Sequence, residues 1–218
     1  MAAEVAKTAA PTPNGQNDEV RQFLAVVLAQ TEDFWGAAFK AAGGLPYEEP
    51  KLVLFTGMIL TACGPASGTS YCAQDHRIYL DPAFPDLPQV ATAGDFAKAL
   101  IVAREVGHHV QNIAGLPHLK AAGDSQEDAI LRSEQVELQA DCFAGLWSHY
   151  VQDQHLLEDT DLTEARNLLR SLGDDRVDNV SASPTARRYG TSEQRIRWYD
   201  RGLAGKAIAD CDTTENPL

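Results

Sequence analysis

The sequence lacks any run of about 18 apolar residues, the length that a helix needs to cross a bilayer, so it predicts no membrane-spanning helix. Its N-terminal stretch also lacks the apolar core of a secretory signal peptide. Positive charge is scarce, because 18 Lys and Arg stand against 31 Asp and Glu, a formal net charge of −13. This balance excludes nucleic acid and anionic membrane surfaces as expected partners, since both are polyanions.

Only four cysteines are present and none lies in a C-x-x-C pair, which argues against a zinc ribbon or a thioredoxin-like site. Cys63 and Cys72 flank a short Gly/Pro/Ser segment that a disulfide spans easily. A bond between Cys142 and Cys211 would tie the C-terminal part to the middle of the chain, and closing a loop of about 70 residues is worth roughly 4 kcal/mol. Four buried free thiols in a cytosolic protein are the alternative.

The spacing of the apolar residues predicts an α+β domain that is mainly helical and has a small β-sheet. We expect residues 1–17 to be a flexible segment, residues 18–213 to form the domain, and residues 214–218 to be a tail. Apolar residues at helical spacing predict helices from Asp18 to about Gly43, from Asp95 to Gly115, and over residues 126–154, 162–172 and 192–202. Strands are predicted at residues 51–56 and 77–81, with a loop over residues 63–72.

The stretch I-V-A-R-E-V-G-H-H-V-Q, residues 101–111, organises the chain. It matches, except at one position, the zinc-peptidase motif H-E-x-x-H. There, two histidines on one helix face hold Zn²⁺ while the glutamate activates the metal-bound water. Glu105 and His108 occupy matching positions, but Arg104 stands at the first histidine. A guanidinium has only donors and stays protonated, so Arg104 cannot be a ligand.

Glu137 and Asp141 lie four residues apart on one face of the next long helix. In gluzincin-type peptidases, a downstream glutamate is the third zinc ligand and the aspartate after it hydrogen-bonds the first histidine. The spacing fits this template, although E-x-x-x-D is also common on solvated helix faces. His109, about 100° round the helix from His108, is interpreted as a packing residue, and His76 as a surface residue.

Five segments taken together resemble the bacterial neutral zinc metallopeptidase family, whose members are typically exported or anchored. The segments are C-G-P-A…Y-C-x-x-D-x-x-I-Y-L-D (63–81), E-V-G-H-H-V-Q (105–111), E-L-Q-A-D-C-x-A-G-x-W (137–147), G-T-S-x-Q-R (190–195) and C-D-T (211–213). They cover roughly residues 50–213 in the family's order. The resemblance implies a zincin-like fold, peptide-bond hydrolysis, zinc as cofactor, and a peptide or protein as substrate or ligand.

Transferred residue by residue, the resemblance implies His108 and Glu137 as zinc ligands and Glu105 as general base. Asp141 is then the residue that hydrogen-bonds the side chain at the first ligand position and orients it. Tyr189 stands where the family has a late histidine, and its hydroxyl could still donate a hydrogen bond to an oxyanion.

The resemblance also implies the disulfides Cys63–Cys72 and Cys142–Cys211, and hence an extracytoplasmic, oxidising compartment. We therefore expect a signal or membrane anchor outside this chain, and contact with a membrane only through it.

Arg104 leaves two functions open. A divalent ion about 4 Å from a guanidinium is repelled by roughly 8 kcal/mol at an effective dielectric near 20. Arg104 can instead form bidentate hydrogen bonds with the carboxylate of Glu137 or Asp141. Its positive charge would then replace the metal, and the chain would need no cofactor. The chain is then either a zinc metallopeptidase with impaired or lost zinc binding, or an inactive pseudopeptidase that binds a peptide or protein. In the second case residues 77–81 are the strand expected to pair with an extended ligand.

Overall fold

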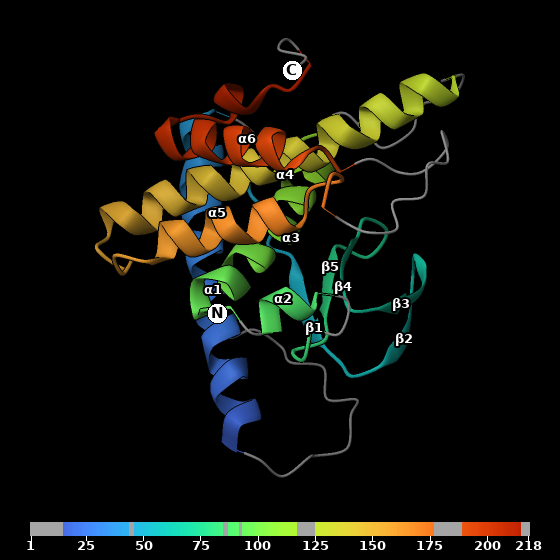
Figure 1. Ribbon diagram of the computed structural model, residues 1–218, viewed down its shortest axis with the longest axis vertical. Helices are drawn as coiled ribbons and strands as arrows, with labels where there is room; N and C mark the ends of the chain where they lie inside the picture. Colours follow the sequence, from blue (N-terminus) through green and yellow to red (C-terminus); the bar gives the residue numbers. More distant parts are fainter. Residues whose placement is uncertain are drawn as a thin grey trace. The chain divides into compact units, whose positions relative to one another are not determined.

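The computed structural model describes residues 15–43, 46–84, 87–91, 93–116, 125–176 and 189–214 (Figure 1). The chain divides into two compact units, Met1–His109 and Val110–Leu218. Most of the expected flexible segment and of the expected tail lie outside the described residues. The expectation that residues 18–213 form one domain stays a prediction.

The first unit contains helices and all the strands of the described residues. Its elements are α1 (Gly15–Ala41), β1 (Lys51–Leu54), β2 (Met58–Thr61), β3 (Gly64–Ser67), β4 (Thr69–Cys72), β5 (Arg77–Leu80), α2 (Pro88–Ala91) and most of α3 (Asp95–Ile113). The α1 helix forms because its apolar residues recur every three to four positions, and this stripe is buried at Leu24, Val27, Leu28 and Trp35. Gly43, at φ +66°, follows its end.

Three of the strands form a mixed sheet in the order β1-β5-β4. The central strand β5 runs parallel to β1 and antiparallel to β4, and its Ile78 lies opposite Leu52 on one side and Tyr71 on the other. The strands predicted at residues 51–56 and 77–81 are therefore confirmed. The expectation that residues 77–81 pair with an extended ligand is wrong, because neighbouring strands occupy both edges of β5.

Residues 63–72 are not a loop, as the sequence predicted, but consist largely of β3 and β4. The β3 strand pairs antiparallel with β2, and Ile59 of β2 packs against a small core that includes Phe55, Cys72 and Tyr79. Gly68, at φ +74°, ends β3 after four residues, and Gly57, at φ +79°, lies just before β2. Strands this short carry no readable alternation, so the turn-forming residues dominated the prediction.

The second unit is helical within the described residues. It contains the end of α3, then α4 (Gln126–Asp153), α5 (Asp161–Ser171), α6 (Ser192–Ala204) and the short 3₁₀ helix η1 (Ile208–Cys211). Reciprocal caps begin two of these helices, since the side chains of Ser125 and Asp128 cap α4 and those of Thr191 and Gln194 cap α6. All the predicted helices are confirmed to within a few residues.

The α4 and α6 helices touch backbone to backbone at two glycines. A Cβ atom on Gly202 would lie 1.9 Å from the carbonyl oxygen of Cys142, and one on Gly145 would lie 2.2 Å from that of Tyr199. Only residues without a side chain permit this approach. The crossing therefore fixes where α6 lies along α4, and Figure 1 shows α5 beside α6 in the same unit.

The predicted fold class, α+β with a small sheet, is confirmed. Its zincin-like character stays a prediction. Among the helices of the described residues, none combines the length and the apolar character that crossing a membrane requires.

Candidate functional site

Residues 101–111 lie on the helix α3, as predicted. Arg104 and Glu105 are buried, with only 6% and 7% of their surfaces exposed, while His108 is half-buried one turn further on. Charged groups are rarely taken from water unless other groups compensate them. Arg104 therefore stands inside the protein, at the position where the H-E-x-x-H motif has its first metal ligand.

His109 is fully buried, which confirms its interpretation as a packing residue. Its Nε2 lies 2.5 Å from the backbone oxygen of Glu48 and its Nδ1 lies 3.0 Å from the hydroxyl of Tyr71. Since a carbonyl only accepts, Nε2–H donates to Glu48 and Nδ1 accepts from Tyr71. Burial lowers the pKa of His109, so the ring is neutral.

His76 is less exposed than a surface residue should be. Its side chain is 35% exposed, its Nδ1 lies 3.2 Å from a carboxylate oxygen of Glu48, and its ring centroid lies 5.6 Å from that of His109. The interpretation of His76 as a surface residue is thus only partly right, because the ring packs at the edge of the cluster around His109.

Glu137 and Asp141 are buried on α4, with 3% and 0% exposed, so the alternative of a solvated helix face is wrong. Asp141 accepts a hydrogen bond from Arg195, whose Nη2 lies 3.0 Å from Oδ1. Arg195 is itself buried, and its Nη1 donates to the backbone oxygen of Leu172 at 3.2 Å. A guanidinium therefore supports the carboxylate of Asp141 within the second unit.

Arg195 is the site residue to which sequence reasoning gave no role, although it ends the segment G-T-S-E-Q-R, residues 190–195. The same segment fixes the start of α6. Gly190 has φ +87° and lies against Leu138, and the side chain of Gln194 caps Thr191 and donates to Glu134 at 2.6 Å. The signal in the sequence was the segment itself, whose residues hold α6 against α4.

Tyr189 lies just before this segment and is 38% exposed. Its backbone N–H donates to the carboxylate of Asp174 at 3.0 Å, so the backbone is anchored while part of the ring faces solvent. Its role as an oxyanion donor stays a prediction.

Both disulfides are present, Cys63–Cys72 in the first unit and Cys142–Cys211 in the second. The alternative of four free thiols is wrong. Disulfides persist where the surroundings are oxidising, so the pair indicates an extracytoplasmic environment.

The donor set of the candidate metal centre does not fit a catalytic zinc ion. Such sites take three protein ligands and a water, and α3 supplies one imidazole, His108, with a buried guanidinium at the other ligand position. Within the part of the chain that the structure describes, no three His, Cys, Asp or Glu side chains gather as metal ligands. The structure brings Arg104, Glu105 and His108 together on α3, and Asp141 together with Arg195.

Residues 1–214 match the family described as "Putative neutral zinc metallopeptidase". The uncharacterized protein YpfJ of Escherichia coli is 40% identical over 213 residues, which cover 93% of this chain and 73% of YpfJ. The uncharacterized proteins Rv2575 of Mycobacterium tuberculosis and Mb2605 of Mycobacterium bovis are each 33% identical over 186 residues, which cover 77% of this chain and 63% of the relative. No solved structure matches.

Proposed function

The chain belongs to the neutral zinc metallopeptidase family, and from this premise we propose that it is a member whose zinc binding is impaired or lost because Arg104 replaces the first histidine ligand. The burial of Arg104 carries the proposal. An exposed arginine could swing into solvent and leave room for an ion, whereas the side chain of Arg104 is only 6% exposed.

Two unfavourable contributions oppose the binding of a metal ion beside Arg104. A zinc ion about 4 Å from the guanidinium is repelled by roughly 8 kcal/mol at an effective dielectric near 20, and one strong nitrogen ligand is missing as well. The roles of Glu105 as general base and of Tyr189 as oxyanion donor depend on the metal. We propose that neither role operates while Arg104 is present.

We propose further that the buried guanidinium of Arg104 takes the place of the metal as the cation of the site on α3.

A second candidate function is binding of a peptide or protein without cleavage. The observation that favours it is the position of β4 at the edge of the three-stranded sheet. Edge strands pair with extended peptides through backbone hydrogen bonds. Because the central strand β5 has no open edge, we propose β4 in its place as the strand that receives such a ligand.

The two disulfides support a location outside the cytoplasm. We propose a periplasmic, secreted or membrane-anchored protein, since thiol reductants in the cytosol oppose such bonds.

Metal analysis of matched variants tests the principal proposal. We expect the unmodified protein to retain little zinc after dialysis, and Arg104→His to retain roughly one zinc ion per chain, because the substitution restores the ligand pair. Arg21→His is the matched control, since it adds a histidine at an exposed position of α1 and should leave the zinc content unchanged.

Peptide hydrolysis separates binding from catalysis. Any activity gained by Arg104→His should be lost in Arg104→His/Glu105→Gln while its zinc is retained. Stoichiometric zinc in the unmodified protein, together with peptide hydrolysis that a chelator abolishes, would contradict the proposal.

A further inference from the structure

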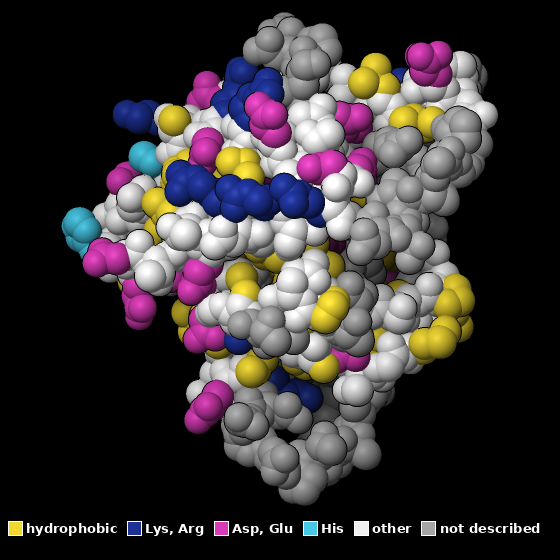
Figure 2. Space-filling view, viewed as in Figure 1, with side chains coloured by type: hydrophobic (Ala, Val, Ile, Leu, Met, Phe, Trp, Pro, Cys, Tyr) yellow, Lys and Arg dark blue, Asp and Glu magenta, His cyan; other side chains and the backbone are white. Residues whose placement is uncertain are grey.

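The ribbon formed by β2 and β3 carries the most exposed large hydrophobic side chains of the described residues. Met58 is 77% exposed and Leu60 is 80% exposed, and both project from the same face of β2 because side chains alternate along a strand. Pro65 of β3 lies opposite Leu60 and is exposed as well. Figure 2 shows apolar side chains gathered at the right-hand edge of the view, where Figure 1 places these two strands. The ribbon therefore presents an apolar surface to solvent.

The outer edge of β2 has backbone groups that β3 does not pair. Leu60 lies opposite Pro65, which has no N–H, so these two residues cannot exchange both hydrogen bonds of a hydrogen-bonded pair. The N–H and C=O of Leu60 therefore point away from β3, and so do those of Met58, because the two kinds of pair alternate along the strands. Within the described residues, β3 is the only strand that pairs with β2. This edge can accept another strand.

The ribbon also lacks charge. Residues 52–74 contain no Asp, Glu, Lys, Arg or His, and they are the longest such stretch in a chain whose net charge is −13. Open edges of sheets usually carry charged residues that prevent pairing with another chain. The Cys63–Cys72 disulfide ties the turn after β2 to β4, so the ribbon is held in place before a partner binds. The edge of β2 is thus open, uncharged and preorganised.

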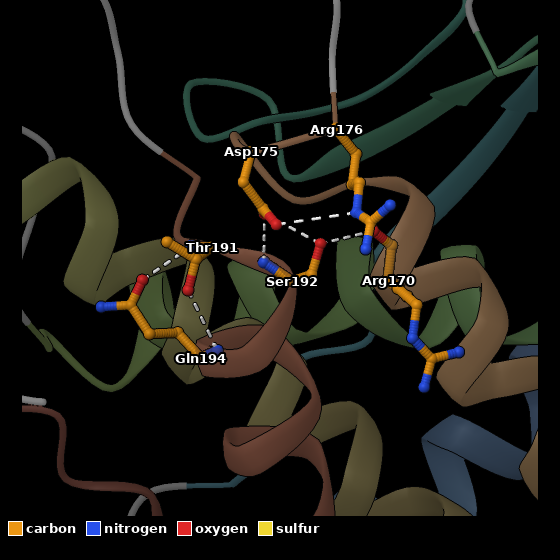
Figure 3. Close-up of polar contacts among 6 residues, drawn as sticks. All are labelled: Arg170, Asp175, Arg176, Thr191, Ser192 and Gln194. Atoms are coloured by element: carbon orange, nitrogen blue, oxygen red, sulfur yellow. Dashed lines mark hydrogen bonds and ion pairs between the residues drawn. The ribbon is translucent and has the colours of Figure 1, made fainter.

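The charged surface at the start of α6 is a contrasting case. Asp175 accepts hydrogen bonds from the backbone N–H of Ser192 at 2.6 Å and from its hydroxyl at 2.8 Å (Figure 3). Nε of Arg176 lies 3.7 Å from the other oxygen of Asp175. These groups compensate one another within one chain, whereas the outward groups of β2 gain partners only from another strand.

We propose that β2 is the docking site for a second copy of this chain, which adds its own β2 in antiparallel orientation. The strand is complementary to itself. When two copies pair about Ile59, Met58 lies opposite Leu60 of the second copy and Leu60 lies opposite its Met58. These are the residues whose N–H and C=O point outward, so both pairs can exchange hydrogen bonds across the two-fold axis. The apolar side chains of the two strands then pack beside one another on one face.

Charge and backbone chemistry favour a second copy over other occupants. Two copies of an acidic chain repel each other where their acidic surfaces meet, and the uncharged ribbon lets them approach without that repulsion. A lipid bilayer would cover the side chains of Met58 and Leu60 but would leave their outward N–H and C=O groups without partners. The ribbon lies wholly within the first unit, and the inference does not depend on Arg104 or on zinc.

Sedimentation equilibrium of the full chain over a range of concentrations tests the inference. We expect a reversible monomer–dimer equilibrium with a Kd of about 1–100 μM, since one pair of short strands buries less area than a stable complex requires. Met58→Lys/Leu60→Lys should raise the Kd by about 100-fold, because like charges then meet across the two-fold axis. Val26→Lys/Leu156→Lys is the matched control. It makes the same change in net charge at hydrophobic residues that are 56% and 54% exposed outside the ribbon, and it should leave the Kd unchanged.

Two substitutions at one position test the strand pairing itself. Leu60→Thr keeps the backbone N–H and a strand-forming side chain, whereas Leu60→Pro removes the outward N–H and leaves the pairing of β2 with β3 possible. The proline variant should raise the Kd about tenfold more than the threonine variant, because the dimer loses the same hydrogen bond on both sides of its axis. If Leu60→Pro unfolds, as circular dichroism would show, Met58→Thr/Leu60→Thr should still raise the Kd by about tenfold.

Several results would overturn the inference. They are a parent that stays monomeric up to about 1 mM, a dimer that Met58→Lys/Leu60→Lys leaves intact, an equal loss of dimer in the control variant, and equal effects of threonine and proline at Leu60. A monomeric parent that binds phosphatidylcholine vesicles through the ribbon would assign it to a lipid surface instead. A monomeric parent that binds a labelled peptide alternating Leu and Thr would assign the edge to a foreign strand.

Discussion

At the residue scale, Asp141 and Arg195 form an ion pair that solvent does not reach. The two side chains are 0% and 2% exposed, and the contact joins residues 54 positions apart in the chain. Removing one partner from such a pair leaves a charge that neither water nor protein compensates. Exposed pairs differ, because water screens both charges before and after the change.

We expect Arg195→Met to lower the free energy of unfolding by about 3–5 kcal/mol, since it keeps the bulk of the side chain but removes the cation beside Asp141. Arg197→Met is the matched control, two residues along the same helix. It loses an ion pair whose side chains are 56% and 87% exposed, so the expected change is below about 1 kcal/mol. Urea unfolding measures both, and equal effects would show that the buried pair is already compensated elsewhere.

Glu32 on α1 is a partly buried carboxyl group with other acidic residues nearby. Burial, with Glu49 and Asp33 nearby, raises its pKa to about 7. The folded protein therefore keeps a proton that the unfolded chain releases, so stability falls as the pH rises from about 5 to about 8.

Glu32→Gln removes this titration. We expect the variant to be more stable than the parent by about 1 kcal/mol near pH 8, after allowance for solvent at a partly exposed side chain, and to be similar to it near pH 5. Urea unfolding at the two pH values measures the difference. A stability difference that is the same at both values would contradict the raised pKa of Glu32.

At the scale of elements, the crossing of α4 and α6 depends on the absence of a side chain. Gly202→Ala places a methyl group 1.9 Å from the Cys142 carbonyl oxygen, so the helices must separate, at a cost of about 1–3 kcal/mol or more. Gly36→Ala is the matched control, because a Cβ there meets nothing within 4 Å and α1 gains helix propensity worth about 0.5–1 kcal/mol. Thermal unfolding should therefore move in opposite directions in the two variants, and a shared direction would contradict the close crossing.

Helices were predictable from the sequence because each carries its own signal. The second long helix was expected over residues 126–154 and spans Gln126–Asp153, since apolar spacing and the cap at Ser125 mark it locally. The four-residue strands β2, β3 and β4 were missed because so few residues show no periodicity. Strand order was equally invisible, since nothing local in residues 77–81 indicates a neighbour on each side.

Only the residues of the candidate site that lie in a sequence motif could be predicted from the sequence. The template placed Glu105 and His108 on a helix, and their helix is α3. It could not show that Arg195 is a partner of Asp141, because that contact exists only once α6 has packed on α4. Sequence separation hides such tertiary contacts.

For the whole molecule, the division into two units gives the disulfides distinct tasks. Cys63–Cys72 closes a separation of 9 residues within the first unit, and Cys142–Cys211 closes one of 69 residues between α4 and η1 in the second. In the chain-entropy model the longer loop restricts the unfolded chain more. The second unit should therefore depend more on oxidation than the first.

We expect Cys142→Ala/Cys211→Ala to lose roughly 4 kcal/mol of unfolding free energy and Cys63→Ala/Cys72→Ala to lose about 3 kcal/mol or less, as the lengths of the two loops require. Each double variant is the control for the other, and urea unfolding without reductant measures both. Dithiothreitol should destabilise the parent by more than it destabilises either variant, because only the parent has both bonds to lose. Full stability of the parent after complete reduction would contradict both the structural role of the disulfides and the proposed oxidising compartment.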